Sequence, residues 1–82
     1  MSLDERTGIL IALGASVSAN CRPCLDYHLE RARKAGLDNP DIAEALETGR
    51  SVRTGAASGM DRKISSIDKS AAVPGKAGAC CC

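Results

Sequence analysis

Two cysteines separated by two residues, with a histidine four residues further on, form the part of this sequence best suited to chemistry. The segment reads Cys21-Arg22-Pro23-Cys24, and His28 follows. Cysteines at positions i and i+3 of a helix's first turn can form a reversible disulfide, and the unpaired N–H groups there stabilise a thiolate. His28 would lie one turn beyond Cys24 on the same face, where it can relay a proton. The spacing predicts a two-cysteine redox centre.

A metal site is the alternative interpretation of these thiols. Two cysteines at this spacing also form half of many zinc sites, but tetrahedral zinc takes four ligands and His28 is the only obvious third. Three further cysteines, Cys80, Cys81 and Cys82, stand together in the sequence, and soft thiolates suit copper(I), zinc or metalloids. On a flexible arm they could reach the Cys21–Cys24 pair. A thiol-rich protein that binds a soft metal or metalloid therefore stays open as a second function.

Two predicted helices flank the cysteine pair. The first spans residues 3–19, where apolar side chains recur at helical spacing and widen beyond a single stripe. The second spans residues 21–35, with Asn20 as its expected N-cap and Gly36 at its end. We therefore expect the cysteine pair on the first turn of the second helix.

A third helix is predicted from Pro40 to about Met60. Its three glycines, Gly49, Gly55 and Gly59, each weaken a helix by about 1 kcal/mol relative to alanine. We interpret them as points where the backbone approaches a neighbour closely. The alternative is a frayed helix that stops near Gly55.

Composition excludes several function classes. The 82 residues include 11 Lys and Arg against 10 Asp and Glu, so a purely electrostatic binder of nucleic acid or membranes is not expected. Tyr27 is the only aromatic residue, which argues against stacking on nucleic-acid bases. The apolar run Ile9–Val17 is far shorter than the roughly 20 residues that span a bilayer. With acidic Asp4 and Glu5 where a secretory signal would be basic, we expect a cytoplasmic chain whose thiols stay reduced.

The chain is short of core-forming residues. Leu, Ile and Val together number 15 of 82, and domains below about 80 residues rarely bury enough core alone. An isolated subunit would expose the apolar face of Ile9–Val17, so we expect a homo-oligomer. Residues 1–69 are predicted to form the helical domain. Residues 70–82, with Val73 as their only large apolar residue, are predicted to be a flexible tail that ends in the cysteine run.

The stretch Ala15–Gly59, with the run SANCRPCLDYHLERARKAGLDNPDIAEAL, resembles the core of the carboxymuconolactone decarboxylase superfamily, in its alkylhydroperoxidase D-like branch. The likeness covers a little over half the chain. It includes the CxxCxxxH motif, the Ala/Gly helix end and the Asn-Pro start of the next helix. It implies an all-α fold assembled into trimers or hexamers. It also implies a thiol-dependent peroxidase or disulfide oxidoreductase that acts on a hydroperoxide or disulfide, takes electrons from a thiol donor and needs no other cofactor.

The resemblance also implies roles for the site residues. Cys24 matches the cysteine that becomes a sulfenic acid, Cys21 the partner that closes the disulfide, and His28 the proton relay. Since Cys21 lies nearer the helix end, we expect it to be the more exposed of the two and to meet the external reductant. The decarboxylase branch lacks this cysteine pair, so decarboxylation is disfavoured.

One position departs from the family pattern. The relay glutamate of the family lies twelve residues before the first cysteine, and that position is Ile9 here. Glu5, one helical turn earlier, or a carboxylate from another subunit could replace it. Efficient reduction of peroxide depends on such a replacement.

Overall fold

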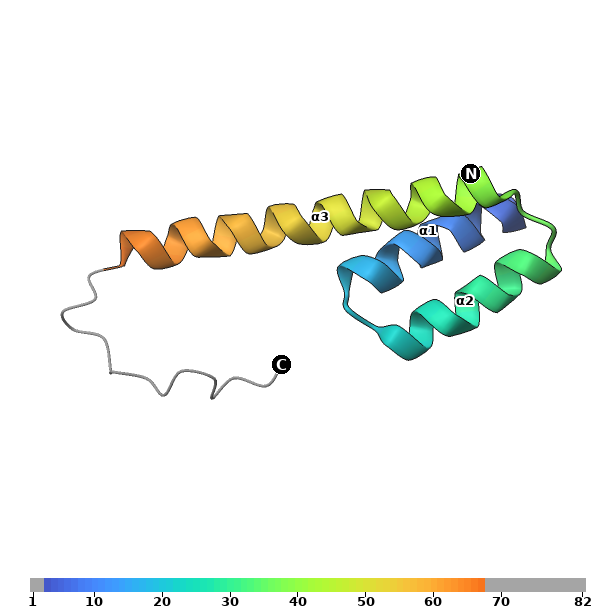
Figure 1. Ribbon diagram of the computed structural model, residues 1–82, viewed down its shortest axis with the longest axis horizontal. Coiled ribbons are helices and arrows are strands. Elements are labelled where there is room, and N and C mark those ends of the chain that lie inside the picture. The colour runs from blue at the N-terminus through green and yellow to red at the C-terminus, as the bar shows by residue number, and fades with distance from the viewer. Residues whose placement is uncertain (1–2, 68–82) are drawn as a thin grey trace.

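The computed structural model describes residues 3–67, and this part of the chain is all-α, as predicted. Its helices are α1 (Glu5–Ser18), α2 (Arg22–Lys34) and α3 (Asn39–Ser66) (Figure 1). α1 packs against both other helices and makes nearly all the contacts between helices. The predicted domain boundary at residue 69 and the predicted flexible tail 70–82, with its three cysteines, lie outside the described residues.

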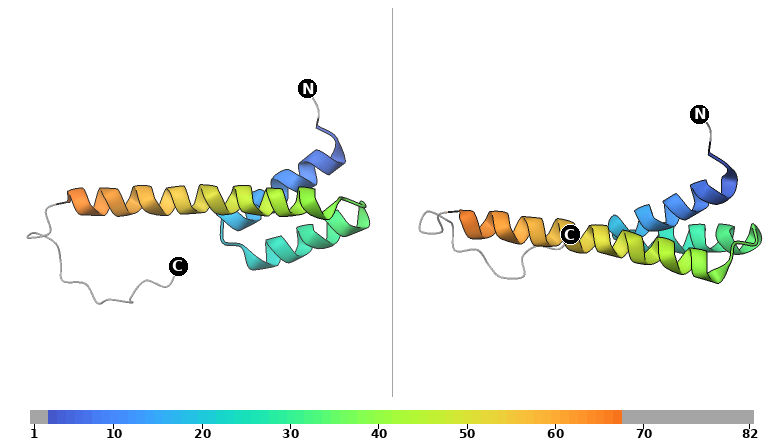
Figure 2. Two further views of the ribbon diagram at one scale, coloured as in Figure 1. Left: turned by 45° about the horizontal axis from the view of Figure 1, so that its top comes forward. Right: turned by 90° about the horizontal axis from the view of Figure 1, so that it is seen from above.

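α1 and α3 cross (Figure 2), and two glycines face each other at the crossing. A Cβ added to Gly49 would lie 2.9 Å from the Cα of Gly14, and one added to Gly14 would lie 3.2 Å from the carbonyl oxygen of Ala45. Because real Cβ atoms need more room, only glycine permits this crossing at position 49. The predicted close approach is confirmed there. No such approach is found among the described residues at Gly55 and Gly59, where an added Cβ would meet no other helix.

α3 is longer than the sequence indicated. It runs unbroken to Ser66, so the alternative in which it frays near Gly55 is wrong. Its second half projects beyond α1 and α2 (Figure 1), and the side chains of Met60 and Ile64 there are exposed. Nothing in the described residues covers this half of the helix.

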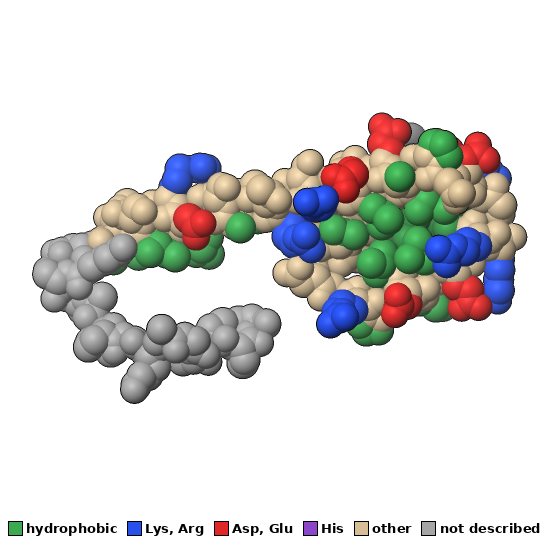
Figure 3. All heavy atoms as spheres, viewed as in Figure 1, with side chains coloured by type: hydrophobic (Ala, Val, Ile, Leu, Met, Phe, Trp, Pro, Cys, Tyr) green, Lys and Arg blue, Asp and Glu red, His purple; other side chains and the backbone are tan. Residues whose placement is uncertain are grey.

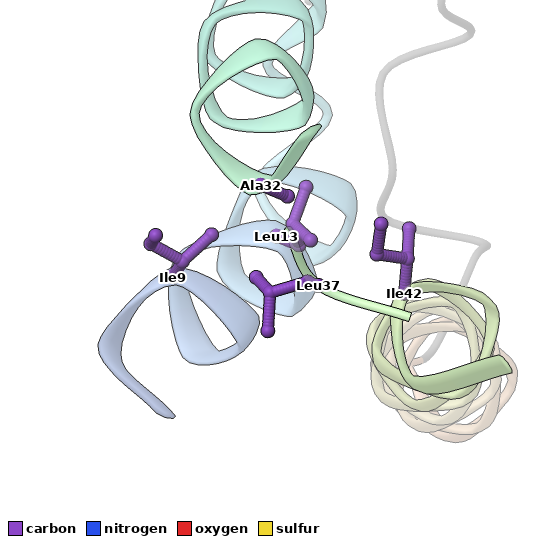
Figure 4. Close-up of a cluster of buried hydrophobic side chains, with 5 residues drawn as sticks. All are labelled: Ile9, Leu13, Ala32, Leu37 and Ile42. Atoms are coloured by element: carbon purple, nitrogen blue, oxygen red, sulfur yellow. The ribbon is translucent and has the colours of Figure 1, made fainter. Parts of the chain in front are cut away.

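The core is small and takes side chains from every helix. Figure 4 shows its five buried members, which are Ile9, Leu13, Ala32, Leu37 and Ile42. The apolar residues of α1 are therefore divided: Ile9 and Leu13 form the centre of the core, while Ile11 is 54% exposed. Figure 3 shows more apolar side chains on the face between α2 and α3, where no helix covers them. This core holds α1 between its two neighbours and fixes the position of the α1–α2 connection.

The connection between α1 and α2, which we call corner 1 (residues 19–21), is a helix-ending motif with a left-handed residue. Asn20 has φ 57°, and its N–H donates to the Val17 carbonyl at 3.1 Å. The N–H of Cys21 then donates to the Ser16 carbonyl at 3.0 Å. This pair of bonds is the Schellman arrangement, in which asparagine is the usual substitute for glycine. The prediction that Asn20 caps α2 is wrong, because it ends α1 and Cys21 caps α2.

The connection between α2 and α3, corner 2 (residues 35–37), repeats the motif. Gly36 has φ 74°, its N–H donates to the Arg33 carbonyl at 3.1 Å, and the N–H of Leu37 donates to the Ala32 carbonyl at 3.0 Å. Gly36 therefore ends α2 as predicted. Corner 1 turns the chain so that α2 lies back along α1, and corner 2 turns it again into α3.

Candidate functional site

The predicted cysteine pair is brought together at the start of α2. Cys21 and Cys24 are joined by a disulfide, with their Cα atoms 5.2 Å apart. That spacing lies within the usual range for disulfides and is also what one helical turn supplies. The bond can therefore open and close without a rearrangement of the backbone.

Cys21 is held by both helices that it connects. Its N–H donates to the Ser16 carbonyl at the end of α1. Its carbonyl accepts from Leu25 N at 3.0 Å, and its Sγ accepts from Cys24 N at 3.3 Å. Cys21 is thus the N-cap of α2, with sulfur in the place of the usual side-chain oxygen. The N–H that contacts this sulfur, and the positive end of the helix dipole behind it, favour negative charge on Cys21 when the disulfide is open.

The two cysteine residues differ in exposure, in the opposite sense to the prediction. Cys24 is exposed, whereas Cys21 is half-buried. The expectation that Cys21 is the more accessible cysteine is wrong, because corner 1 turns it back against the end of α1. Cys21 instead lines a surface pocket of about 370 Å³, together with Val17, Leu25 and Arg53. A reactant reaches Cys24 from open solvent and reaches Cys21 by way of this pocket.

Arg53 is a site residue that the sequence did not indicate. It projects from α3, and its Nη1 donates to Asn20 Oδ1 at 3.2 Å and to the Val17 carbonyl at 3.5 Å. The guanidinium thereby ties α3 to corner 1. No local signal in the sequence links Arg53 to a cysteine 32 residues earlier, since the contact exists only after α1 and α3 have crossed.

His28 lies one turn after Cys24 on α2 and is half-buried. Its ring meets the Tyr27 ring edge-to-face, with centroids 4.9 Å apart. Its Nδ1 is buried and has no hydrogen-bond partner among the described residues. Helical spacing puts the side chains of positions i and i+4 within about 6 Å of each other, so His28 shares a face with Cys24 as predicted. In this oxidised state no hydrogen bond within residues 3–67 joins the imidazole to either sulfur.

The family's relay carboxylate has no equivalent in the described part of the chain. Ile9 is 1% exposed and belongs to the core. Glu5, the expected substitute, pairs with Arg31 at 3.9 Å and makes no hydrogen bond to His28. Within residues 3–67, the Nδ1 atom of His28 is therefore left without a carboxylate partner.

The metal-site alternative gains no support from residues 3–67. No group of three or more His, Cys, Asp or Glu side chains there is arranged to hold a metal ion. Cys80, Cys81 and Cys82 lie outside the described residues. Over the same part of the chain, no helix is both long enough and apolar enough to cross a membrane.

Comparison with known proteins assigns the chain to a family. The model of the carboxymuconolactone decarboxylase family matches residues 1–59, which include all of α1 and α2 and most of α3. The chain belongs to the carboxymuconolactone decarboxylase family. This family contains enzymes, and the bonded cysteine pair is compatible with a redox role.

A curated relative supports the same assignment. "Uncharacterized protein 4 in cox locus" of Paracoccus denitrificans is 38% identical over 56 residues, which are 68% of this chain and 50% of the relative. The chain therefore spans about half the length of the curated protein it matches. Among solved structures, none is significantly similar to this chain.

Proposed function

We propose that this chain is a thiol-dependent oxidoreductase of the alkylhydroperoxidase D-like branch, which cycles Cys21 and Cys24 between dithiol and disulfide. The observation that carries the proposal is the bonded CxxC pair on the first turn of α2, followed by His28, in a member of this family. The substrates are a hydroperoxide or a disulfide, and the electrons come from a thiol donor. Because the cycle needs a thiol donor, we place it in the reducing environment of the cytoplasm.

In the oxidative half of the proposed cycle, Cys24 is the attacking thiolate. It is exposed, and it shares a helix face with His28, which accepts its proton. The thiolate attacks one peroxide oxygen, the O–O bond breaks, and the products are a sulfenic acid on Cys24 and an alcohol. Cys21 then attacks the Cys24 sulfur, the disulfide forms and water leaves. The N–H of Cys24 that contacts the Cys21 sulfur stabilises the thiolate required for this second step.

In the reductive half, two equivalents of donor thiol open the disulfide. The first forms a mixed disulfide with the Cys21 sulfur and releases Cys24 as a thiolate, which receives through His28 the proton that the donor thiol lost. The second attacks the donor's sulfur, releases Cys21 and leaves the donor as a disulfide. Cys21 meets the donor through its pocket rather than by being the more exposed cysteine.

The missing relay carboxylate should affect the reaction rates of the two substrate classes differently. His28 has no acidic partner in the described residues, and the family's glutamate position is filled by Ile9 in the core. Proton transfer to the leaving oxygen of a peroxide depends on such a relay more than thiol–disulfide exchange does. We therefore expect a single subunit to exchange disulfides faster than it reduces peroxides.

Two serine variants test the proposed division of labour. Cys21→Ser keeps an N-cap oxygen on α2 and should react once with a hydroperoxide, accumulating a sulfenic acid on Cys24 because the resolving thiol is gone. Cys24→Ser should react far more slowly. Mass spectrometry after treatment with a sulfenic-acid trap identifies the labelled residue. Label on Cys21 in Cys24→Ser, with none on Cys24 in Cys21→Ser, would reverse the roles.

We further propose that the active form is a homo-oligomer, a trimer or hexamer as the family resemblance implies. Large apolar side chains are exposed along α1 and α3, among them Ile11 at 54%, Val52 at 58% and Met60 at 61%. Ile11 and Val52 also line an apolar groove of about 500 Å³ between these helices. Light scattering at micromolar concentration should give a multiple of the subunit mass. A compact, cooperatively folded monomer would contradict this.

A further inference from the structure

The pocket beside Cys21 has a lining that disulfide chemistry alone does not require. Its volume of about 370 Å³ is at the lower end of the range for small-molecule sites. Val17 and Leu25 provide apolar surface, while Asn20, Arg22 and Arg53 provide polar groups, and Cys21 supplies the reactive sulfur. Cys24 is not part of the lining. A molecule held here would therefore meet one sulfur of the disulfide and not the other.

The two arginines give the pocket uncompensated positive charge. No acidic side chain lines it, and neither Arg22 nor Arg53 takes part in the ion pairs formed within residues 3–67. Figure 3 shows basic side chains gathered where α3 leaves the α1–α2 pair. An unpaired arginine at the edge of an apolar pocket is suited to bind an anion, because burying part of the anion strengthens the attraction.

Arg53 is already oriented for such a contact. Its Nη1 is fixed by bonds to Asn20 Oδ1 and the Val17 carbonyl, and no hydrogen bond within the described residues uses its remaining N–H groups. A guanidinium held by one nitrogen loses little further freedom when its other nitrogens bind. A planar carboxylate matches the paired N–H groups of arginine better than a single-point ligand does.

We propose that this pocket binds the carboxylate of a small thiol donor and directs the donor's sulfur to Cys21. The proposal rests on the proposed thiol–disulfide cycle and adds the chemical class of its electron donor. The donor thiolate attacks the Cys21 sulfur, the Cys21–Cys24 bond breaks, and its electron pair remains on Cys24. A second donor thiolate then attacks the first donor's sulfur, which gives the oxidised donor disulfide and free Cys21. The oxidant uses the exposed Cys24 and does not need the pocket.

The test compares two thiols that differ in charge. The reduction of the Cys21–Cys24 disulfide is timed by alkylating free thiols and counting them by mass spectrometry, with 3-mercaptopropionate and with neutral 2-mercaptoethanol. For each thiol, the rate for wild type is divided by the rate for Arg53→Gln, which cancels the thiols' intrinsic reactivities. We expect this ratio to be about tenfold larger for the carboxylate thiol. In wild type, the rate of reduction by 3-mercaptopropionate relative to that by 2-mercaptoethanol should fall as ionic strength rises.

Matched variants separate binding from a structural role of Arg53. Arg53→Lys keeps the charge but neither the planar paired N–H groups nor the bonds to corner 1, so its preference for the carboxylate thiol should fall between those of wild type and Arg53→Gln. Arg62→Gln removes an exposed arginine further along α3 and should match wild type. If Arg53→Lys behaves like Arg53→Gln, or if both thiols give equal ratios, the pocket does not select an anionic donor and the proposal is overturned.

A second measurement assigns the pocket to the donor or to the oxidant. Reduced protein is oxidised with a neutral hydroperoxide and with one that carries a carboxylate, and the loss of free thiols is timed in wild type and Arg53→Gln. A carboxylate preference in this step alone would overturn the assignment to the donor. Failure of the proposed function is distinct from either result. In that case neither a hydroperoxide nor a disulfide substrate is turned over, yet the charge preference for opening the Cys21–Cys24 disulfide persists.

Discussion

Corners 1 and 2 have the same backbone motif and hold different kinds of residue at the same position. The second residue after the helix cap donates its N–H back into the preceding helix in both cases, at 3.0 Å. In corner 2 this residue is Leu37, which is 7% exposed and belongs to the core. In corner 1 it is Cys21, which is half-buried and carries the disulfide. One local geometry thus supports either packing or chemistry.

The spacing to the next helix accounts for this difference. After corner 1 there is no extra residue, so Cys21 must also be the N-cap of α2. After corner 2 the cap of α3 is Asp38, one residue later, which leaves the Leu37 side chain free to enter the core. Cys21 therefore bonds to the end of one helix and caps the next, and its side chain stays half-buried. The shorter connection therefore keeps a reactive side chain at the surface and beside the first turn of a helix.

The largest expected effect on stability comes from the core residue of corner 2. Leu37→Ala should lower the free energy of unfolding by about 2–5 kcal/mol, since it removes a buried side chain from a small core. Cys21→Ser, compared in reducing buffer, should stay within about 0.5 kcal/mol of wild type because serine also caps helices. Urea denaturation followed by circular dichroism measures both changes.

The disulfide chemistry of the two variants should show the reverse of their effects on stability. Under conditions where it is folded, Leu37→Ala should keep the wild-type rate of disulfide opening by a thiol. Cys21→Ser cannot form the disulfide at all. If Cys21→Ser destabilised the reduced protein as much as Leu37→Ala, Cys21 would be a packing residue and the contrast between the corners would disappear.

The left-handed residues of the two corners should give a smaller difference. Gly36→Ala meets no neighbouring atom, so its cost is conformational only, about 1–2 kcal/mol at φ 74°. Asn20→Gly should change stability by less than this. Glycine tolerates the left-handed backbone equally well, but the variant loses the oxygen that accepts from Arg53. Thermal unfolding of the two variants checks the order, and a larger loss for Asn20→Gly would show that the Arg53 bond dominates corner 1.

The sequence predicted the three helices well and their junctions less well. Helical spacing of apolar residues located α1 and α2 to within two residues at each end, and Gly36 was identified as the end of α2. Asn20 was assigned to the wrong helix, because asparagine favours both N-caps and left-handed helix ends. The length of α3 was underestimated, since its glycines at 55 and 59 lie in a helix that continues without a tertiary neighbour among residues 3–67.

The site was predictable where it is local in sequence. Cys21, Cys24 and His28 lie within eight residues, so helical geometry alone relates them. The exposure of the two cysteines was predicted in the wrong order, because it depends on how corner 1 turns against α1. The pocket and Arg53 could not be predicted, since they require α3 to cross α1 at Gly14 and Gly49. Local spacing therefore identified the reacting atoms, while tertiary packing decides which of them a substrate reaches.

The smallest expected effect concerns how the helices begin. Cys21 caps α2 through sulfur and Asp38 caps α3 without a side-chain bond, whereas Asp4 caps α1 by accepting from Thr7 N at 2.8 Å. Hydrogen bonding from Thr7, first from its side chain and then from its backbone N–H, lowers the pKa of Asp4 below its ordinary value of 3.8. A carboxyl group whose pKa falls on folding stabilises the protein above the unfolded pKa and loses that contribution as pH drops.

Asp4→Ala should therefore be slightly less stable than wild type near neutral pH, and this difference in stability should close as the pH falls below about 3.8. Urea unfolding over a pH series measures the gap. Asp38→Ala serves as the control, since its side chain makes no capping bond, and a gap that stayed constant down to low pH would mean that the Asp4 charge does not contribute to the cap.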